Sequence, residues 1–240
     1  MAYLFIIILI MKWSVIKMNI NLVIFDMDGL MFDSENLYFK SWKEAMKKMG
    51  HEPSMDVFLK TLGITDEKTR EFYTDYFGDE LEGKRFCKIT IEIFAGLLSK
   101  GELKVKPGLT ELIDYLNRNN IKKAIASSNN RKVIFRNIEV TGIKNDFDYI
   151  ISGDDVKEGK PHPEIFERVC EALNIAKENT LILEDSLNGI KAGHAASIKS
   201  IMIPDLLMPT EEAKEKSHTI LNSLFEVIDF LEKSNNGARR

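Results

Sequence analysis

Residues 22–30 (LVIFDMDGL) constrain the fold of this chain more than any other segment. The four consecutive apolar residues are typical of a strand that is buried on both faces, as in a parallel sheet. The strand then ends in Asp26 and Asp28, whose side chains point the same way in an extended chain. Two carboxylates at the end of a buried strand destabilise the fold unless a cation neutralises them. The pattern predicts a metal or catalytic site, and the plain alternative is a solvated loop that happens to contain two acids.

Strands and helices alternate along most of the remaining chain. We expect strands at residues 22–25, 121–126, 148–151, 180–183 and 200–203, with the last of these as the final strand. Helical patterns of ordinary length lie between them. This alternation predicts an α/β fold with a doubly wound, Rossmann-like parallel sheet and right-handed connections. In such sheets ligands bind beyond the carboxyl ends of the strands.

One long segment departs from the alternation. No convincing strand falls within residues 33–99, where Phe39, Trp42, Met46 and Met49 follow a helical period instead. We therefore expect an α-helical domain inserted directly after the first strand. The predicted division is a core of residues 18–34 and 104–240, a helical cap domain of residues 35–103, and a hydrophobic N-terminal extension of residues 1–17.

The N-terminal extension is the least ordinary part of the sequence. Residues 2–11 (AYLFIIILIM) are continuously apolar, but the run is shorter than the roughly 20 residues of a membrane span. It also lacks the basic start and small-residue cleavage site of a secretory signal. A weak membrane-surface anchor, an extra packed element and an upstream extension remain open. We favour an extension of a protein that begins near Met18, so contact with a membrane is expected only if the extension is native.

The composition and charge of the chain are those of an ordinary globular protein and do not suggest a nucleic-acid partner. The 240 residues are 44% hydrophobic and 29% charged, as in ordinary globular proteins. The net charge of −4 is spread along the chain and gives no reason to expect nucleic acid. Cys87 and Cys170 form neither a metal-ligand nor a disulfide pattern, which favours a reducing, cytoplasmic location. We expect a monomer.

Polar residues also follow the other predicted strands, or lie in loops at the same edge. Because the carboxyl ends of parallel strands meet at one edge of a sheet, we expect these side chains to gather around one site. Together with the first two aspartates, the candidates are Ser127, Ser128, Asn129, Lys160, Glu184 and Asp185.

This set of residues suits phosphoryl transfer. Several carboxylates at one edge repel one another unless a cation is present, and Mg²⁺ prefers such oxygen ligands. No set of cysteines and histidines favours zinc. Ser127 and neighbouring backbone amides can donate hydrogen bonds to phosphoryl oxygens, and Lys160 can offset negative charge. One aspartate can then attack phosphorus while the other protonates the leaving oxygen.

The same residues resemble the motifs of a known family. The segments Asp26-Met27-Asp28-Gly29-Leu30, Ser127, Lys160-Pro161 and Glu184-Asp185-Ser186 are similar to the four successive motifs of the haloacid dehalogenase-like (HAD) phosphohydrolase superfamily. The helical insert directly after the first motif resembles the β-phosphoglucomutase-like branch, which has an α-helical cap. The resemblance covers roughly residues 21–231 and leaves out the N-terminal extension.

The resemblance implies a role for each site residue. Asp26 would be the nucleophile and Asp28 the general acid and base. Ser127 and Lys160 would hold the phosphoryl group. From their position beside Ser127, we also expect Ser128 and Asn129 to bind substrate or phosphate. Mg²⁺ would be bound by Asp26, Glu184, Asp185 and the backbone carbonyl of Asp28. The cap would close over substrate about hinges near residues 33–36 and 103–106.

The cap decides between two reactions. By the resemblance, mutases carry a histidine where this chain has Tyr38, and an arginine in a glycine-containing loop where this chain has Asp66. Arg70, one turn later, could replace that arginine. We therefore favour a Mg²⁺-dependent phosphatase acting on a small phosphorylated metabolite, such as a sugar phosphate. A phosphosugar mutase and a non-catalytic sugar-phosphate-binding regulator are the alternatives.

Overall fold

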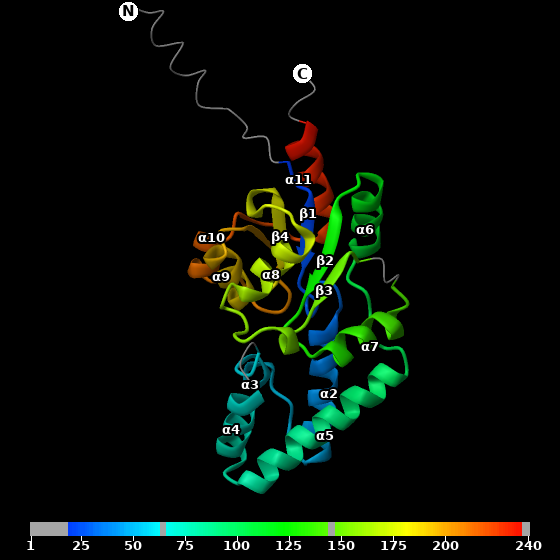
Figure 1. The fold of residues 1–240 in the computed structure, drawn as a ribbon. Coiled ribbons are helices and arrows are strands. Elements are labelled where there is room, and N and C mark those ends of the chain that lie inside the picture. Colours follow the sequence, from blue (N-terminus) through cyan, green and yellow to red (C-terminus); the bar gives the residue numbers. More distant parts are fainter. Residues whose placement is uncertain (1–18, 63–65, 144–146, 237–240) are drawn as a thin grey trace, which may run out of the picture.

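A six-stranded parallel sheet is the framework of the computed structural model, which describes residues 19–62, 66–143 and 147–236 (Figure 1). The strand order is β3-β2-β1-β4-β5-β6. The strands are β1 (Leu22–Phe25), β2 (Lys122–Ala126), β3 (Tyr149–Ile151), β4 (Thr180–Glu184), β5 (Lys199–Met202) and β6 (Thr219–Ile220). Phe25 pairs in register with Ile125 of β2 and Leu183 of β4, so these three strands end at one edge. The predicted doubly wound α/β fold is confirmed.

The prediction that residues 200–203 form the last strand is wrong, because β6 follows β5 at the edge of the sheet. β6 has only two residues, too few to show an alternating pattern in the sequence. Backbone hydrogen bonds on either side hold it in place: His218 N donates to Ser200 O at 2.8 Å and Leu221 N donates to Met202 O at 2.9 Å.

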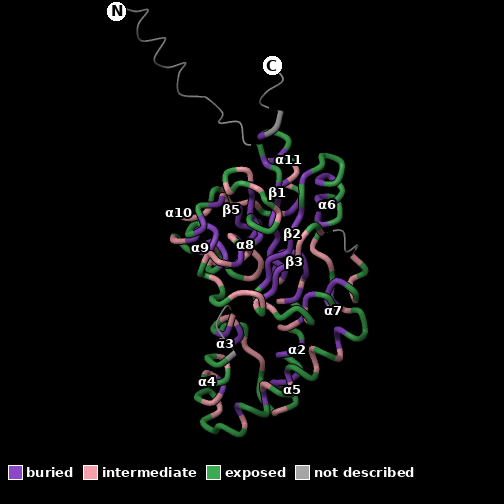
Figure 2. Tube along the Cα trace, viewed as in Figure 1, coloured by how far each residue is buried: buried purple, intermediate pink, exposed green. Residues whose placement is uncertain are grey.

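Helices cover both faces of the sheet. One face packs against α6 (Leu109–Arg118), α7 (Arg131–Thr141) and α11 (Leu224–Asn236), the other against α8 (Glu164–Leu173) and α9 (Leu187–Ala195). Val23 and Phe25 of β1 belong to the first cluster, and Leu22 and Ile24 to the second. All four side chains are fully buried, and Figure 2 shows the strands as the buried layer. Burial on both faces explains why the strand is a continuous apolar run.

The first four described helices after β1 form a separate layer beyond the carboxyl end of β1 (Figure 1). They are α2 (Ser34–Lys48), α3 (Met55–Leu59), α4 (Asp66–Phe77) and α5 (Glu80–Ser99). Their own hydrophobic cluster, hereafter the cap cluster, is centred on Trp42, Phe58, Tyr73 and Phe86. The indole N–H of Trp42 donates to the Tyr73 hydroxyl at 2.5 Å. The helical insert therefore has its own core, and its predicted bounds of 35–103 stay a prediction.

Two chain segments connect the insert to the sheet, and they run side by side. Asp33 N donates to Lys104 O and Lys106 N donates to Met31 O, both at 2.9 Å. An antiparallel bridge joins Phe32 to Val105 between them. The predicted hinges at 33–36 and 103–106 fall on this pair of segments, and hinge motion stays a prediction.

Two features named from the sequence lie outside the described residues: the N-terminal extension of residues 1–17, and the cap loop at 63–65 with the side chain of Asp66. The remaining helix α10 (Glu211–Lys216) and the short 3₁₀ turns η1 (Gly153–Asp155) and η2 (Lys177–Asn179) complete the fold. Within the described ranges, no helix combines the length and the apolarity that crossing a membrane requires.

Candidate active site

Lys160 joins the ends of three strands at the carboxyl edge of the sheet. Its ammonium donates to Asp26 Oδ1 at 2.5 Å, to Glu184 Oε1 at 2.6 Å and to the carbonyl of Ala126 at 2.9 Å. The side chain is 4% exposed. Burial acts to lower the pKa of Lys160, but the Asp26 and Glu184 carboxylates outweigh it and raise that pKa above its ordinary value. Lys160 is therefore a permanent buried cation between two acids.

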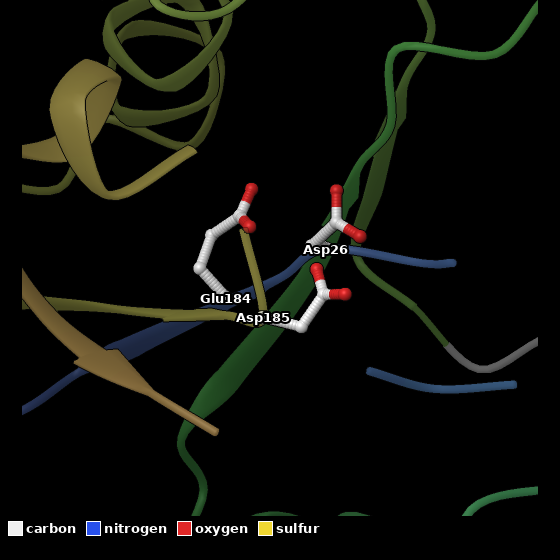
Figure 3. A group of neighbouring side chains, drawn as sticks. All are labelled: Asp26, Glu184 and Asp185. Carbon is white, nitrogen blue, oxygen red and sulfur yellow. The ribbon is translucent and has the colours of Figure 1, made fainter. Parts of the chain in front are cut away.

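Three carboxylates meet beside this lysine: Asp26, Glu184 and Asp185, with oxygens within 4.8 Å of one another (Figure 3). Burial and then the charge of Glu184 raise the pKa of Asp26 to about 8, even though Lys160 opposes both effects. Burial and then the Asp26 and Glu184 charges raise the pKa of Asp185 well above its ordinary value. Oxygen donors whose charge is only partly compensated are the environment that Mg²⁺ prefers, so this donor set fits the predicted ion.

Glu184 also contacts the start of α9, in addition to pairing with Lys160. Its Oε2 accepts hydrogen bonds from Ser186 N at 3.1 Å and Ser186 Oγ at 2.9 Å, so it also fixes the start of α9. Gly189 in α9 passes so close that a Cβ there would lie 1.7 Å from Glu184 Oε1. The glycine is therefore required for the buried carboxylate to fit beneath the helix.

Replacing this glycine tests that close approach. Alanine in place of glycine normally stabilises a helix by up to about 1 kcal/mol, so the matched control Gly96→Ala in α5, where a Cβ meets nothing within 4 Å, should raise the unfolding free energy. Gly189→Ala should instead lower it by about 1–3 kcal/mol because Glu184 must move. Urea unfolding measures both. Equal stabilisation by the two substitutions would contradict the packing described here.

Asp28 faces the end of β2 rather than the three-carboxylate group. Asn129 Nδ2 donates to Asp28 Oδ2, and Asn129 N donates to Ser127 Oγ at 3.1 Å. Burial raises the pKa of Asp28, while hydrogen bonds from Ser34 and Asn129 oppose the rise. Ser127 is buried next to them, whereas Ser128 is exposed in the same turn. The structure thus brings Asp28, Ser127 and Asn129 together and leaves Ser128 at the surface.

Sequence reasoning missed two acids at this edge, Glu35 and Asp205. Burial raises the pKa of Glu35 to about 7, with smaller effects from the Asp28 and Asp205 charges. Asp205 follows β5, its side chain is 7% exposed, and it pairs with Lys106 at 2.6 Å. The strand-end rule that found Glu184 and Asp185 would also have found Asp205. Glu35 looks in the sequence like an ordinary acid in the first turn of a helix.

The raised carboxyl pKa values predict that the metal-free chain loses stability as the pH rises. A group whose pKa is higher in the folded state than in the unfolded state stabilises the fold. For Asp26 this stabilisation is fully present below the unfolded-state pKa of 3.8 and is lost as the pH rises to the folded-state pKa of about 8. As the pH rises from about 6 to about 8, the titration of Asp26 alone should lower the unfolding free energy by about 2 kcal/mol. Urea unfolding in excess EDTA measures this loss.

Two comparisons sharpen that measurement. Saturating Mg²⁺ should remove most of the loss, because a cation stabilises the charged carboxylates. Asp26→Asn should reduce the pH dependence of the unfolding free energy measured without metal, because the amide does not titrate and the share of Asp26 is lost. Stability in EDTA that stays level or increases over this range would contradict the assignment of uncompensated acids.

Comparison with known proteins places this geometry in a family. A haloacid dehalogenase-like hydrolase family model matches residues 23–203. The phosphorylated carbohydrates phosphatase of Thermotoga maritima is 31% identical over 218 residues, which cover 86% of this chain and 99% of that protein. The crystal structure of CbbY from Rhodobacter sphaeroides in complex with phosphate has a TM-score of 0.69 at 25% identity, covering 87% of this chain and 96% of that one.

A further solved structure shares the fold. The β-phosphoglucomutase of Clostridium difficile has a TM-score of 0.68 at 22% identity, covering 91% of this chain and 98% of that chain. Together, the family match, the relative from Thermotoga maritima and the shared architecture agree with the motifs around Asp26 and Lys160. This chain belongs to the haloacid dehalogenase-like hydrolase family.

Proposed function

We propose that this chain is a Mg²⁺-dependent phosphatase that hydrolyses a small phosphorylated sugar through an aspartyl phosphate on Asp26. The observation that carries the proposal is the buried contact of Lys160 with Asp26 and Glu184, beside Asp185, at the carboxyl edge of the sheet. Such a cluster costs stability unless it serves a charged ligand. The name of the relative from Thermotoga maritima, a phosphorylated carbohydrates phosphatase, supports a sugar phosphate as that ligand.

The proposed chemistry uses the two aspartates in turn. The Asp26 carboxylate attacks phosphorus while Asp28 donates a proton to the leaving sugar oxygen. Asp28, now ionised, then takes a proton from the water that attacks the aspartyl phosphate, which releases inorganic phosphate and restores Asp26. Asn129, which donates to Asp28 Oδ2, would hold the Asp28 carboxyl in place for both transfers.

The charges around Asp26 divide the remaining work. Mg²⁺, which Asp26 and Asp185 would hold, would neutralise charge on the transferring phosphoryl group. Lys160 already directs its three N–H donors to Asp26, Glu184 and Ala126, so it acts on phosphate as a nearby positive charge. Ser127, buried beside Asn129, would donate to a phosphoryl oxygen. Glu184 stays a predicted ligand, although both of its oxygens already accept hydrogen bonds.

The cap supports hydrolysis over mutase chemistry. Tyr38, in the place of the mutase histidine, packs among aromatic rings, 6.2 Å from the Phe58 centroid and 5.8 Å from that of Phe94. Arg70 is exposed on α4. A packed phenol lacks the imidazole base that the mutase resemblance requires. A CbbY variant has been crystallised with xylulose-(1,5)bisphosphate, which supports a sugar carrying phosphate as the substrate class.

A panel of phosphorylated sugars tests the proposal. With Mg²⁺ we expect release of inorganic phosphate from one group of sugar phosphates, and none when EDTA is in excess. β-Glucose 1-phosphate with a trace of its bisphosphate serves as the mutase assay, and isomerisation without phosphate release would overturn the phosphatase assignment. Absence of turnover on every ester would favour the non-catalytic regulator.

A further inference from the structure

The loop after β5 places another carboxylate against the site. Asp205 has a side chain that is 7% exposed, and its Oδ1 accepts from Lys106 at 2.6 Å. Its other oxygen, Oδ2, is buried, and among the described residues it has no hydrogen-bond partner. A buried carboxylate oxygen without a donor costs about 1–3 kcal/mol or more, so such an oxygen calls for a ligand.

Oδ2 of Asp205 is directed at the three-carboxylate group. A Cβ placed on Gly29 would lie 2.1 Å from Asp185 Oδ2 and 3.4 Å from Asp205 Oδ2, so both oxygens border the same small space. Gly29 has a φ of +76°, which lets the backbone after Asp28 turn there. The charge of Asp205 also contributes to raising the pKa of Asp185, as expected for near neighbours.

Contacts on both sides fix this carboxylate. Lys106 belongs to the segment that returns from the insert, where its backbone N donates to Met31 O at 2.9 Å. The next residue in the loop, Leu206, packs against the cap cluster. Asp205 is thereby held between the insert and the sheet, with one oxygen used and the other facing the acids. An acceptor held in this way needs no rearrangement to receive a donor.

We propose that Asp205 is a positioning residue of the cation site, with Oδ2 accepting a hydrogen bond from a water on the cation that Asp26 and Asp185 hold. Asp205 is not among the residues whose oxygens lie within 4.8 Å of one another, so it acts through a water and not as a direct ligand. The inference rests on the Mg²⁺ dependence proposed above. Outer partners of metal sites typically contribute about 10- to 100-fold to metal affinity.

Calorimetric titration of Mg²⁺ into the full, substrate-free chain tests this role. Asp205→Asn, which keeps the shape and an acceptor for Lys106, should weaken Mg²⁺ binding by about tenfold or more. The matched control is Glu102→Gln, because Glu102 also forms a short lysine pair, 2.5 Å from Lys40, but at the surface. Its Mg²⁺ affinity should equal that of the unaltered chain. An Asp205→Asn affinity within about twofold of the unaltered chain would overturn the role.

Two further measurements separate this role from other effects. Asp205→Ser is titrated in parallel, so that a folded variant is available if the amide disturbs the loop, and the same loss is expected. At saturating Mg²⁺ the kcat of Asp205→Asn should recover to within about threefold of normal while the half-activating Mg²⁺ concentration rises, whereas a purely structural defect would lower kcat at every concentration. If the unaltered chain binds no Mg²⁺, the proposed function fails. If the unaltered chain binds Mg²⁺ and both Asp205 variants bind it equally well, only the role of Asp205 fails.

Discussion

Asp26→Asn is expected to lower kcat on the best sugar phosphate by on the order of 10⁴-fold or more, because an amide cannot attack phosphorus. The fold should survive, since the amide oxygen can still accept from Lys160, which now donates to Asp26 Oδ1 at 2.5 Å. Steady-state phosphate release together with an unfolding curve separates these two effects. A residual rate within about tenfold of normal would show that another group attacks phosphorus.

The neighbouring aspartate provides a graded comparison. Asp28→Asn should lower kcat by about 10²- to 10⁴-fold, the usual contribution of a proton-transfer group. Asp114→Asn, on the exposed side of α6, removes a carboxylate without touching the site and should leave kcat unchanged. Rapid acid quenching should trap phosphate on the unaltered protein and none on Asp26→Asn. Phosphate bound equally to both proteins would mean that the intermediate forms elsewhere.

Strand ends account for what could be predicted from the sequence. In a parallel sheet, a continuous apolar run that stops at a carboxylate indicates a site at the carboxyl edge, and this pattern pointed to Asp26, Glu184 and Asp185, whose oxygens the structure brings together. The rule works because register aligns the ends of β1, β2 and β4 at the same edge. The sequence also predicted Lys160 as a cation in a loop at this edge. Its direct contact with two of those acids could not be predicted from their positions along the chain.

The parts that sequence reasoning missed depend on contacts between distant segments. The raised pKa of Glu35 is caused by desolvation and, to a smaller extent, by the charges of Asp28 and Asp205, and no local pattern shows either effect. Asp205 acquires its position from Lys106, 99 residues earlier in the chain. β6 is too short to show the alternating pattern of a strand in the sequence, and it is recognised as a strand only by its pairing with β5. Local periodicity therefore predicts elements and strand ends, while burial of charge is decided by packing.

Lys160→Met should lower the unfolding free energy of the metal-free chain by about 3–5 kcal/mol, because it leaves two buried carboxylates without their cation. The lysine and its partners are nearly inaccessible to water, with side-chain exposures of 4% for Lys160, 13% for Asp26 and 0% for Glu184. Methionine fills a similar volume, so the loss reports charge more than packing. Lys40→Met is the matched control, since the Lys40–Glu102 pair is as short but largely exposed, and its unfolding curve should not move measurably.

The origin of that loss can be tested by removing one of the acids as well. If uncompensated charge destabilises Lys160→Met, the double variant Lys160→Met/Glu184→Gln should be more stable than Lys160→Met alone, although it has lost one more native side chain. Glutamine can still accept the hydrogen bonds from Ser186 that now reach Glu184 Oε2. The loss in Lys160→Met should also shrink as the pH falls, because a protonated carboxyl no longer needs a cation. Urea unfolding at about pH 5 and about pH 8 measures both effects, and a double variant weaker than Lys160→Met at each pH would show that the lysine stabilises the fold by packing instead.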